Sequence, residues 1–225
     1  MLDWIREHKL IFIAVLLVVG FGIYALSQRP SSPQNDSQTA FTNIDMSSPM
    51  IRGNKSAKVS IIQYSDFLCP SCTYFTTQIM PTIDKKYVQS GKVMFEFRPM
   101  AFIADGSTQS GMGAYCAIDQ KKFWEYHDSI YNYVADQVLV KKLDPKVAVI
   151  LTSDLVKGIA GQAGLDTKSF NSCLDSQKYA EKISDVTQTA NKNGVLSTPY
   201  ILINGQKYQG DMTLEAVESL IKADL

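Results

Sequence analysis

The chain has 225 residues, of which 45% are hydrophobic and 20% are charged. Its 22 basic residues balance its 22 acidic residues, so no basic surplus indicates nucleic-acid binding. The length provides for one good-sized domain with extensions.

An uncharged apolar run of 17 residues, 10–26, lies close to the N-terminus. It is at the short end of the length that spans a bilayer and is long for the core of a signal peptide. Two basic residues before the run, Arg6 and Lys9, favour a cytoplasmic location for 1–9. We therefore expect a single-pass anchor at 10–26, with the rest of the chain outside the cytoplasmic membrane. The alternative is a signal peptide cleaved after Ser27, which would release a secreted protein.

The segment 27–49 is rich in Ser, Pro, Gln, Asn and Thr and shows no apolar periodicity. This composition predicts a flexible tether. Such a tether would hold the following domain near the membrane and allow it to reorient. The folded domain is expected over 50–225.

The first part of this domain has the pattern of a β-α-β unit. Residues 59–64 form an apolar run typical of a strand, and 73–90 carry apolar residues at helical spacing. Pro81 is expected to kink that helix. Alternating residues over 92–99 predict the next strand. The two strands should therefore be parallel and joined by a right-handed crossover.

The middle of the domain, about 105–193, carries helical patterns and no strand signal. The helices are expected over 107–120, 122–134, 144–155, 166–174 and 177–191. Strands return at 198–203 and 206–209, separated by an Asn-Gly pair, which is the strongest short hairpin signal. A final amphipathic helix is expected over 213–223.

The clearest chemical signal is the pair Cys69 and Cys72, which follows the first strand and precedes the first helix. A helix N-terminus has unpaired N–H groups and a partial positive charge, which stabilise a thiolate. A cysteine there can have its pKa lowered from ~8.5 to ~3.5–7.5. Pro70 suits the first helical position because it has no N–H to leave unpaired. We expect Cys69 to be an exposed, activated cap residue and Cys72 to be more shielded, together forming a redox-active dithiol.

A CxxC pair also occurs as half of a zinc site or as an inert disulfide. A closed zinc site usually needs a second close pair, whereas Cys116 and Cys173 are far apart and the chain has two histidines. No metal or other cofactor is therefore expected. An even number of cysteines in an exported protein favours a structural disulfide between Cys116 and Cys173. The alternatives are two buried free thiols or a second redox relay.

The order of elements resembles the thioredoxin fold with an inserted helical domain, as in the DsbA family of thiol–disulfide oxidoreductases. It looks most like the membrane-tethered bacterial members with a CPSC motif. The resemblance covers about 58–225, and its specific pieces are DFLCPSC, KFWEYHD, STPYILING and GDM. It implies an α/β, thioredoxin-like fold with a helical insertion, preceded here by the expected N-terminal transmembrane helix.

The resemblance also implies roles for the site residues. Substrate thiolates would attack Cys69, while Cys72 would leave and later re-form the pair. The Thr198–Pro199 peptide bond would be cis and lie beside the cysteines, with the Thr198 backbone pairing with substrate. From sequence alone, the alternative is a trans proline that starts an edge strand. Pro70 and Ser71, between the cysteines, complete the expected substrate-binding residues.

Other residues near these motifs carry weaker signals. Gln63, six residues before Cys69, stands where many relatives have a buried Asp or Glu that takes up the proton of the second thiol. An amide does not titrate, so no proton relay is expected at Gln63. Asp66 is expected to be a solvated turn residue, and His127 a structural one. Three aromatic residues are candidates for an apolar substrate groove but fit the hydrophobic core equally well: Phe67, Phe102 and Tyr200.

The implied function is donation of the Cys69–Cys72 disulfide to unfolded or reduced exported proteins. A quinone-linked membrane partner would reoxidise the pair, and the protein is expected to be a monomer. One alternative is a disulfide reductase or isomerase, although isomerases of this class usually carry a dimerisation domain, for which the tether has no room. Another is a tethered copper- or peptide-binding protein that uses the CxxC as ligands. The sequence leaves the reduction potential and the substrates open.

Overall fold

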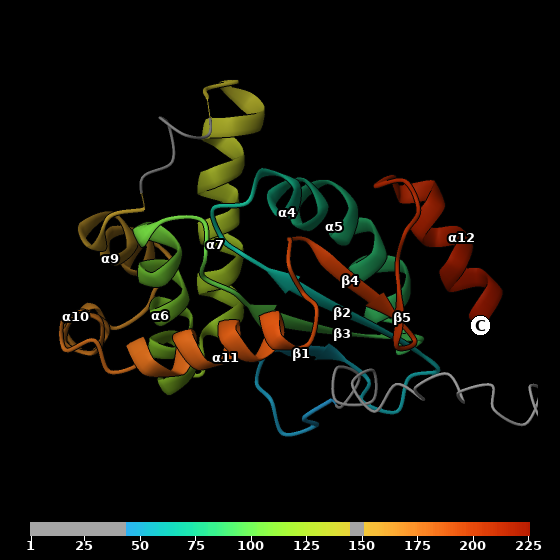
Figure 1. Cartoon of the computed structure of the whole chain (residues 1–225), viewed down its shortest axis with the longest axis horizontal. Coiled ribbons are helices and arrows are strands. Elements are labelled where there is room, and N and C mark those ends of the chain that lie inside the picture. The colour runs from blue at the N-terminus through green and yellow to red at the C-terminus, as the bar shows by residue number, and fades with distance from the viewer. Residues whose placement is uncertain (1–43, 145–150) are drawn as a thin grey trace, which may run out of the picture. The chain divides into compact units, whose positions relative to one another are not determined.

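The computed structural model describes residues 44–144 and 151–225, and Figure 1 shows how their helices and strands are arranged. A five-stranded sheet with the order β1-β3-β2-β4-β5 forms the centre of the domain. The strands are β1 (Ile51–Gly53), β2 (Val59–Ser65), β3 (Val93–Pro99), β4 (Tyr200–Ile203) and β5 (Gln206–Lys207).

The N-terminal segment 1–9, the expected anchor 10–26 and residues 27–43 of the expected tether lie outside the described residues. Among the residues that the structure does describe, no helix is both long enough and apolar enough to cross a membrane. The described residues therefore belong to the domain expected over 50–225 and to the six residues before it, 44–49.

The strand pairing confirms the β-α-β unit and the terminal hairpin. β2 and β3 are parallel, with Ile61 opposite Phe95, and β4 is antiparallel to β2, with Ile203 opposite Ile61. In the turn between β4 and β5, Asn204 and Gly205 have φ values of 48° and 77°, the left-handed backbone that a two-residue hairpin turn requires. The sequence did not predict β1, which pairs with β3, because its three residues, none of them buried, carry no alternation.

The helix expected over 73–90 is a succession of short segments rather than one regular α-helix. In chain order they are α4 (Pro70–Tyr74), the π-helix η1 (Phe75–Ile79), α5 (Met80–Ile83) and the π-helix η2 (Asp84–Val88). Pro81 lies in the first turn of α5, immediately after η1. Because proline has no N–H to continue the hydrogen-bond ladder, the change from π to α geometry falls where the sequence predicts a kink.

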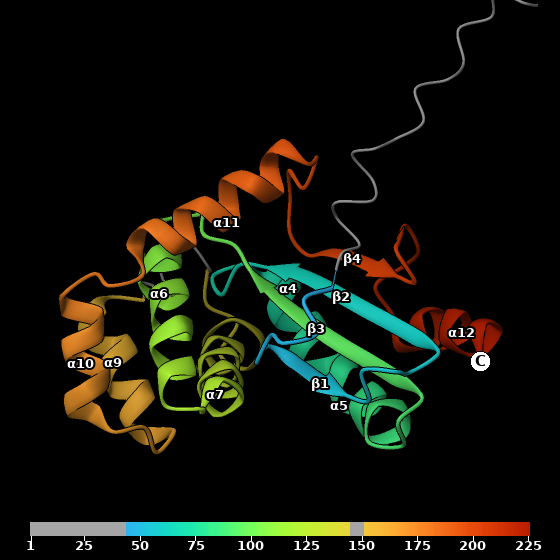
Figure 2. The same ribbon diagram turned by 90° about the horizontal axis from the view of Figure 1, so that it is seen from below.

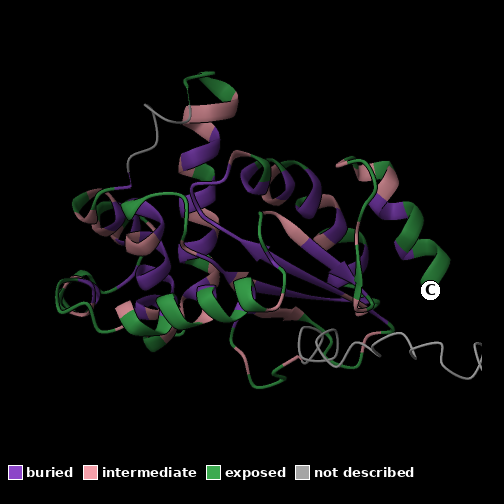
Figure 3. Ribbon diagram, viewed as in Figure 1, coloured by how far each residue is buried: buried purple, intermediate pink, exposed green. Residues whose placement is uncertain are grey.

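Helices cover both faces of the sheet. The α4–η2 segments and α12 (Leu214–Asp224) lie on one face, and α11 (Ala180–Lys192) lies on the other (Figure 1, Figure 2). Neighbouring residues of β2 therefore enter different clusters, Ile61 the main core and Ile62 a smaller cluster that includes Ala190 of α11. Figure 3 shows the central strands as largely buried between these layers.

Between β3 and β4 the chain forms the predicted helical insertion. Its described helices are α6 (Asp105–Asp119), α7 (Phe123–Ala135), the π-helix η3 (Asp136–Val140), α9 (Ser153–Gln162), α10 (Thr167–Asp175) and α11. The prediction of one helix over 144–155 is wrong near its end. Thr152 is not inside a helix but caps one that begins at Ser153. The Thr152 hydroxyl accepts the N–H of Leu155. Residues 145–150 lie outside the described part of the chain.

Two glycines of α6 allow its neighbours to approach closely. A Cβ at Gly111 would lie 2.7 Å from Cγ1 of Ile183 in α11, and a Cβ at Gly113 would overlap the Tyr126 hydroxyl of α7. That hydroxyl donates to the Ser110 carbonyl at 2.8 Å. Side chains of α7 and α11 thus pack directly against the backbone of α6, and larger side chains on α6 would separate the helices.

A disulfide reinforces the same region. Cys116 of α6 is bonded to Cys173 of α10, and the two are 57 residues apart in sequence. A cross-link of this span stabilises a fold by about 2–4 kcal/mol, mainly by restricting the unfolded chain. The bond lies within the insertion, apart from the other two cysteines, which are free.

We expect Gly113→Ala to lower the free energy of unfolding by roughly 1–3 kcal/mol, because the added methyl group has no room beside Tyr126. Gly158→Ala is the matched control, since a Cβ at this helical position meets nothing within 4 Å. It should raise the free energy of unfolding by about 0.5–1 kcal/mol through helix propensity. Urea denaturation of both variants measures the difference, and equal stabilities would contradict the packing argument.

Candidate active site

The CxxC motif occupies the junction between β2 and α4. Cys69 is the cap residue of α4, with extended backbone angles of φ −77° and ψ 118°, and Pro70 lies in the first turn. The Cys69 carbonyl accepts the Thr73 N–H at 2.9 Å, so the helix begins directly at the motif. The strand-to-helix placement predicted from the sequence is confirmed.

Asp66 fixes the turn before the motif, and its prediction as a solvated residue was wrong. Its side chain is fully buried. One carboxylate oxygen accepts the Leu68 N–H at 2.9 Å, and the other accepts the N–H groups of Phe102 and Ile103 at 3.1 and 3.3 Å. Burial raises the pKa of Asp66, while these hydrogen bonds oppose the increase. The residue therefore ties the cysteine turn to the loop that follows β3.

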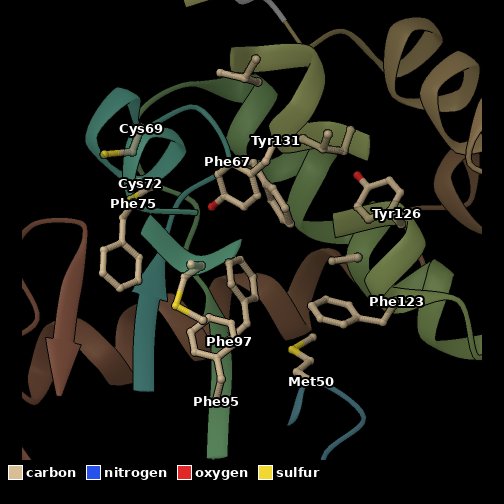
Figure 4. Packing of buried hydrophobic residues seen from close by; sticks show 14 of the residues in the cluster. Met50, Phe67, Cys69, Cys72, Phe75, Phe95, Phe97, Phe123, Tyr126 and Tyr131 are labelled. Atoms are coloured by element: carbon tan, nitrogen blue, oxygen red, sulfur yellow. The ribbon is translucent and has the colours of Figure 1, made fainter. Parts of the chain in front are cut away.

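Cys69 is less exposed than the sequence predicts, with a relative exposure of 6%. The chain around Thr198 covers it, and the Cys69 thiol lies 3.3 Å from the Thr198 carbonyl oxygen. In Figure 4 its sulfur nevertheless points away from the aromatic side chains of the core. Cover by a segment distant in the sequence therefore explains the difference from the prediction.

The two thiols of the motif have opposite pKa shifts. A hydrogen bond from the Cys72 thiol, followed by contacts with Thr198 and with the N–H groups of Cys72 and Ser71, lowers the pKa of Cys69 to about 6 despite its burial. Burial raises the pKa of the Cys72 thiol well above its ordinary value. At neutral pH the reduced site therefore holds one thiolate, at Cys69, and one thiol, at Cys72.

The residues expected to bind substrate surround Cys69. The Thr198–Pro199 peptide bond is cis, and both residues are partly exposed beside the motif. Ser71 is exposed and Pro70 partly exposed. The structure thus brings all four of these residues to one side of the domain, around the Cys69 sulfur, where a polypeptide could approach.

The three aromatic residues considered for a substrate groove differ clearly in their exposure. Phe67 is fully buried and packs on Phe97 and Tyr131, so it belongs to the core. Phe102 is exposed, in the loop bound by Asp66. Tyr200 is partly exposed at the start of β4.

His127 has the structural surroundings that the sequence predicts. Its side chain is buried, and Nδ1 lies 2.7 Å from a carboxylate oxygen of Asp128, which also pairs with Arg52. Burial lowers the pKa of His127, so the ring is neutral at pH 7. The rings around it come from the sheet and the insertion: Phe67, Phe97, Phe123, Trp124 and Tyr131.

Sequence reasoning missed two residues next to Cys72. Ser65, the last residue of β2, hydrogen-bonds to the Cys72 thiol, and its hydroxyl lies 2.7 Å from the Tyr131 hydroxyl of α7. Gln63 also reaches Ser65, because its amide nitrogen donates to the Ser65 hydroxyl at 3.1 Å. A serine at a strand end and a tyrosine in a distant helix carry no motif, so only the folded arrangement reveals this cluster.

The fold and the site together define a thioredoxin-like protein with a dithiol suited to thiol–disulfide exchange. A family model described as Thioredoxin matches residues 45–223, so the chain belongs to the thioredoxin family.

Relatives with curated names agree with this class. The chain is 28% identical over 196 residues to the "Probable disulfide bond formation protein D" of Bacillus anthracis, covering 86% of this chain and 84% of that protein. It is 23% identical over 177 residues to "Disulfide bond formation protein D" of Bacillus subtilis, covering 78% of this chain and 76% of that protein.

Solved structures establish the same fold. BdbD from Bacillus subtilis superimposes with a TM-score of 0.67 at 20% identity, covering 78% of this chain and 91% of that one. Alpha-DsbA1 from Wolbachia pipientis superimposes with a TM-score of 0.66 at 21% identity, covering 83% of this chain and 94% of that one. The resemblance to DsbA-like thiol–disulfide oxidoreductases inferred from the sequence motifs is confirmed.

We expect the alkylation rate of Cys69 in the reduced protein to rise with pH through about 6 and then to level off, because the thiolate is the reactive form. Since the folded pKa lies below the unfolded one, the stability that Cys69 gives the reduced fold is present above the unfolded pKa and lost as the pH falls through about 6. Iodoacetamide labelling followed by mass spectrometry measures the rate, with Cys72 staying unmodified. A midpoint near an ordinary thiol pKa would contradict the expectation.

Proposed function

We propose that this protein is an oxidative thiol–disulfide oxidoreductase that donates the Cys69–Cys72 disulfide to exported proteins. The observation that carries the proposal is the pair of opposed thiol pKa shifts. A stabilised Cys69 thiolate favours the reduced form of the pair, which makes the oxidised form a stronger oxidant. The names of the curated relatives support the same direction of exchange.

The reaction has two steps, and each exchanges one sulfur for another. A substrate thiolate attacks the Cys69 sulfur, forms a mixed disulfide and displaces Cys72, which takes up a proton because its pKa is raised. The second thiolate of the substrate then attacks the substrate sulfur of the mixed disulfide. Cys69 leaves as a thiolate, which its low pKa makes a good leaving group. Two electrons pass from the substrate to the cysteine pair, and the substrate gains a disulfide.

The substrate polypeptide lies, in this proposal, along Thr198 and Pro199, with Pro70 and Ser71 on the other side of the attacked sulfur. Support comes from the position of the Thr198 carbonyl, 3.3 Å from the Cys69 sulfur, which puts its backbone beside the reacting atoms. Pairing through backbone groups holds an extended peptide regardless of the side chains of that peptide. Such pairing suits an enzyme that acts on many unfolded substrates.

We further propose that the domain acts on the outer side of the cytoplasmic membrane as a monomer held by an anchor at 10–26 and a tether at 27–49. The uncharged run and the basic residues before it support this arrangement. A quinone-linked membrane protein would accept the electrons from the reduced pair. An anchored location keeps the domain close to such a partner, because a flexible tether maintains a high local concentration.

Cys69→Ser should abolish oxidation of a reduced, unfolded test protein, because the attacked sulfur is gone. Cys72→Ser should abolish it as well, because Cys69 then has no partner sulfur with which to form the disulfide that is donated. The control is the double variant Cys116→Ala/Cys173→Ala, which should keep the activity because it removes a disulfide that lies in the insertion, apart from the CxxC pair. Activity is followed by the gain of disulfides in the substrate. Full activity in Cys69→Ser would refute the assignment, and equilibration of the pair with glutathione separates an oxidant from a reductase or isomerase.

The full chain should sediment with membranes and resist extraction by high salt and alkaline carbonate, while detergent should release it. A variant that begins at residue 50 should be soluble and keep its oxidase activity on the test protein. Release of the intact full chain by carbonate alone, or a mature N-terminus just after Ser27, would show secretion instead of anchoring.

A further inference from the structure

The proposed reaction requires a proton to reach and to leave a buried sulfur. Cys72 has a relative exposure of 0% and carries the proton whenever the pair is reduced. For the disulfide to re-form, Cys72 has to become a thiolate that attacks Cys69. Gln63 of β2, whose amide lies 3.1 Å from the Ser65 hydroxyl, has no proton to exchange at neutral pH. Some other group has to stabilise the anionic sulfur.

Ser65 is the polar side chain that contacts this sulfur from β2. It is fully buried, and its hydroxyl lies 2.7 Å from the Tyr131 hydroxyl and 3.1 Å from the Gln63 amide nitrogen. Its hydrogen bond to the Cys72 thiol lowers the pKa of that thiol. In Figure 4 the Tyr131 oxygen lies on the side of its ring that faces the cysteine turn. Strand β2, helix α4 and helix α7 therefore meet at one hydroxyl group.

Counting donors and acceptors restricts what this hydroxyl can do. A serine hydroxyl has one proton to donate and accepts two hydrogen bonds. The Gln63 N–H permanently occupies one acceptor position. One donor and one acceptor position remain, and they face Cys72 and Tyr131. Only two arrangements satisfy both neighbours, and they differ in the direction of each hydrogen bond.

The two arrangements correspond to the two protonation states of Cys72. When Cys72 is a thiol, it donates to Ser65, and Ser65 donates to Tyr131. When Cys72 is a thiolate, Ser65 turns to donate to the sulfur, and Tyr131 donates to Ser65. In the first state the Tyr131 proton can turn to the Asp66 carbonyl, 3.5 Å away. Neither state leaves the serine hydroxyl unpaired, although it is fully buried.

We propose that Ser65 is a catalytic residue of the exchange reaction, whose hydroxyl donates a hydrogen bond to the Cys72 sulfur each time that sulfur becomes anionic. Tyr131 and Gln63 are positioning residues, because they set the direction of the Ser65 hydroxyl. The proposal deepens the proposed function and rests on it. During re-formation of the disulfide, the Cys72 electron pair forms the bond to Cys69 and the outgoing sulfur leaves as a thiolate. The proton of Cys72 passes to the solvent, where that thiolate can take it up.

The charges around the cluster suit this role. Three titratable groups face Ser65 and Cys72: Cys69 at the start of α4, Asp66 in the turn before it and Tyr131 on α7. The Tyr131 ring packs on the neutral His127 ring, with centroids 4.9 Å apart. Burial raises the pKa of Tyr131 well above its ordinary value, so it remains a proton donor at neutral pH. The Ser65 hydrogen bond lowers the pKa of Cys72 against the effect of burial. No carboxylate of this group contacts the Cys72 sulfur directly.

The test measures Cys72 as a nucleophile without any substrate protein. Reduced protein is converted to the Cys69–glutathione mixed disulfide, and the release of glutathione by Cys72 is followed as a function of pH. We expect Ser65→Ala to slow the release roughly tenfold at neutral pH and to shift the pH profile upward by about one unit, because the thiolate loses a hydrogen bond. Tyr131→Phe should shift the profile in the same direction by a smaller amount.

Tyr126→Phe is the matched control. Tyr126 is also a fully buried tyrosine of α7, but its hydroxyl bonds to the Ser110 carbonyl instead of Ser65. This variant should keep the wild-type rate and pH profile. Unchanged profiles in both Ser65→Ala and Tyr131→Phe would overturn the proposal. If Ser65→Ala fails to fold, Tyr131→Phe decides alone, since it removes one oxygen and retains the ring.

The outcome is separable from that of the proposed function. A wild-type protein that fails to oxidise unfolded substrates would refute the oxidase, while the glutathione release would still report on Ser65. Conversely, an active oxidase whose release rate ignores Ser65 and Tyr131 would refute only the role of the hydroxyl.

Discussion

The arrangement of the site depends on one buried carboxylate, that of Asp66. It accepts an N–H from its own turn, at Leu68, and two from the loop after β3, at Phe102 and Ile103. β2 and β3 are parallel neighbours, so the segments that follow them emerge at the same edge of the sheet. Asp66 joins those segments there. A buried carboxylate without such donors would be strongly destabilising, so the N–H groups stabilise the carboxylate and the carboxylate holds both backbone segments in place.

On this fixed turn, Cys69 and Cys72 are three residues apart on one helix but have thiols with opposite pKa shifts. Cys69, at the cap, receives hydrogen bonds from the N–H groups of Ser71 and Cys72. Cys72 lies a turn further in, where the surrounding core removes it from water. Helix geometry keeps the two sulfurs adjacent while giving them opposite environments. The chemical asymmetry of the pair therefore follows from where the helix begins, and the proposed oxidase reaction uses both halves of it.

The helical insertion takes part in the site as well as covering the sheet. Helix α7 supplies Tyr131 to the cluster around Cys72, and the chain that leaves α11 brings Thr198 against Cys69. The insertion is itself braced by close packing at Gly111 and Gly113 of α6 and by its own disulfide. A rigid support of this kind holds reacting groups in place better than a mobile loop would.

Local patterns in the sequence determined the order of strands and helices after β1, the Asn-Gly hairpin and the placement of Cys69 at a helix start, because each depends on residues close together in the chain. The tertiary structure alone decided how those pieces meet. The cover over Cys69 comes from Thr198, 129 residues away, and the partner of Ser65 is Tyr131, 66 residues away. The burial of Asp66 likewise depends on a loop more than thirty residues later. Periodicity and capping signals describe neighbours in the chain, whereas burial and hydrogen bonding at the site depend on segments that only folding brings together.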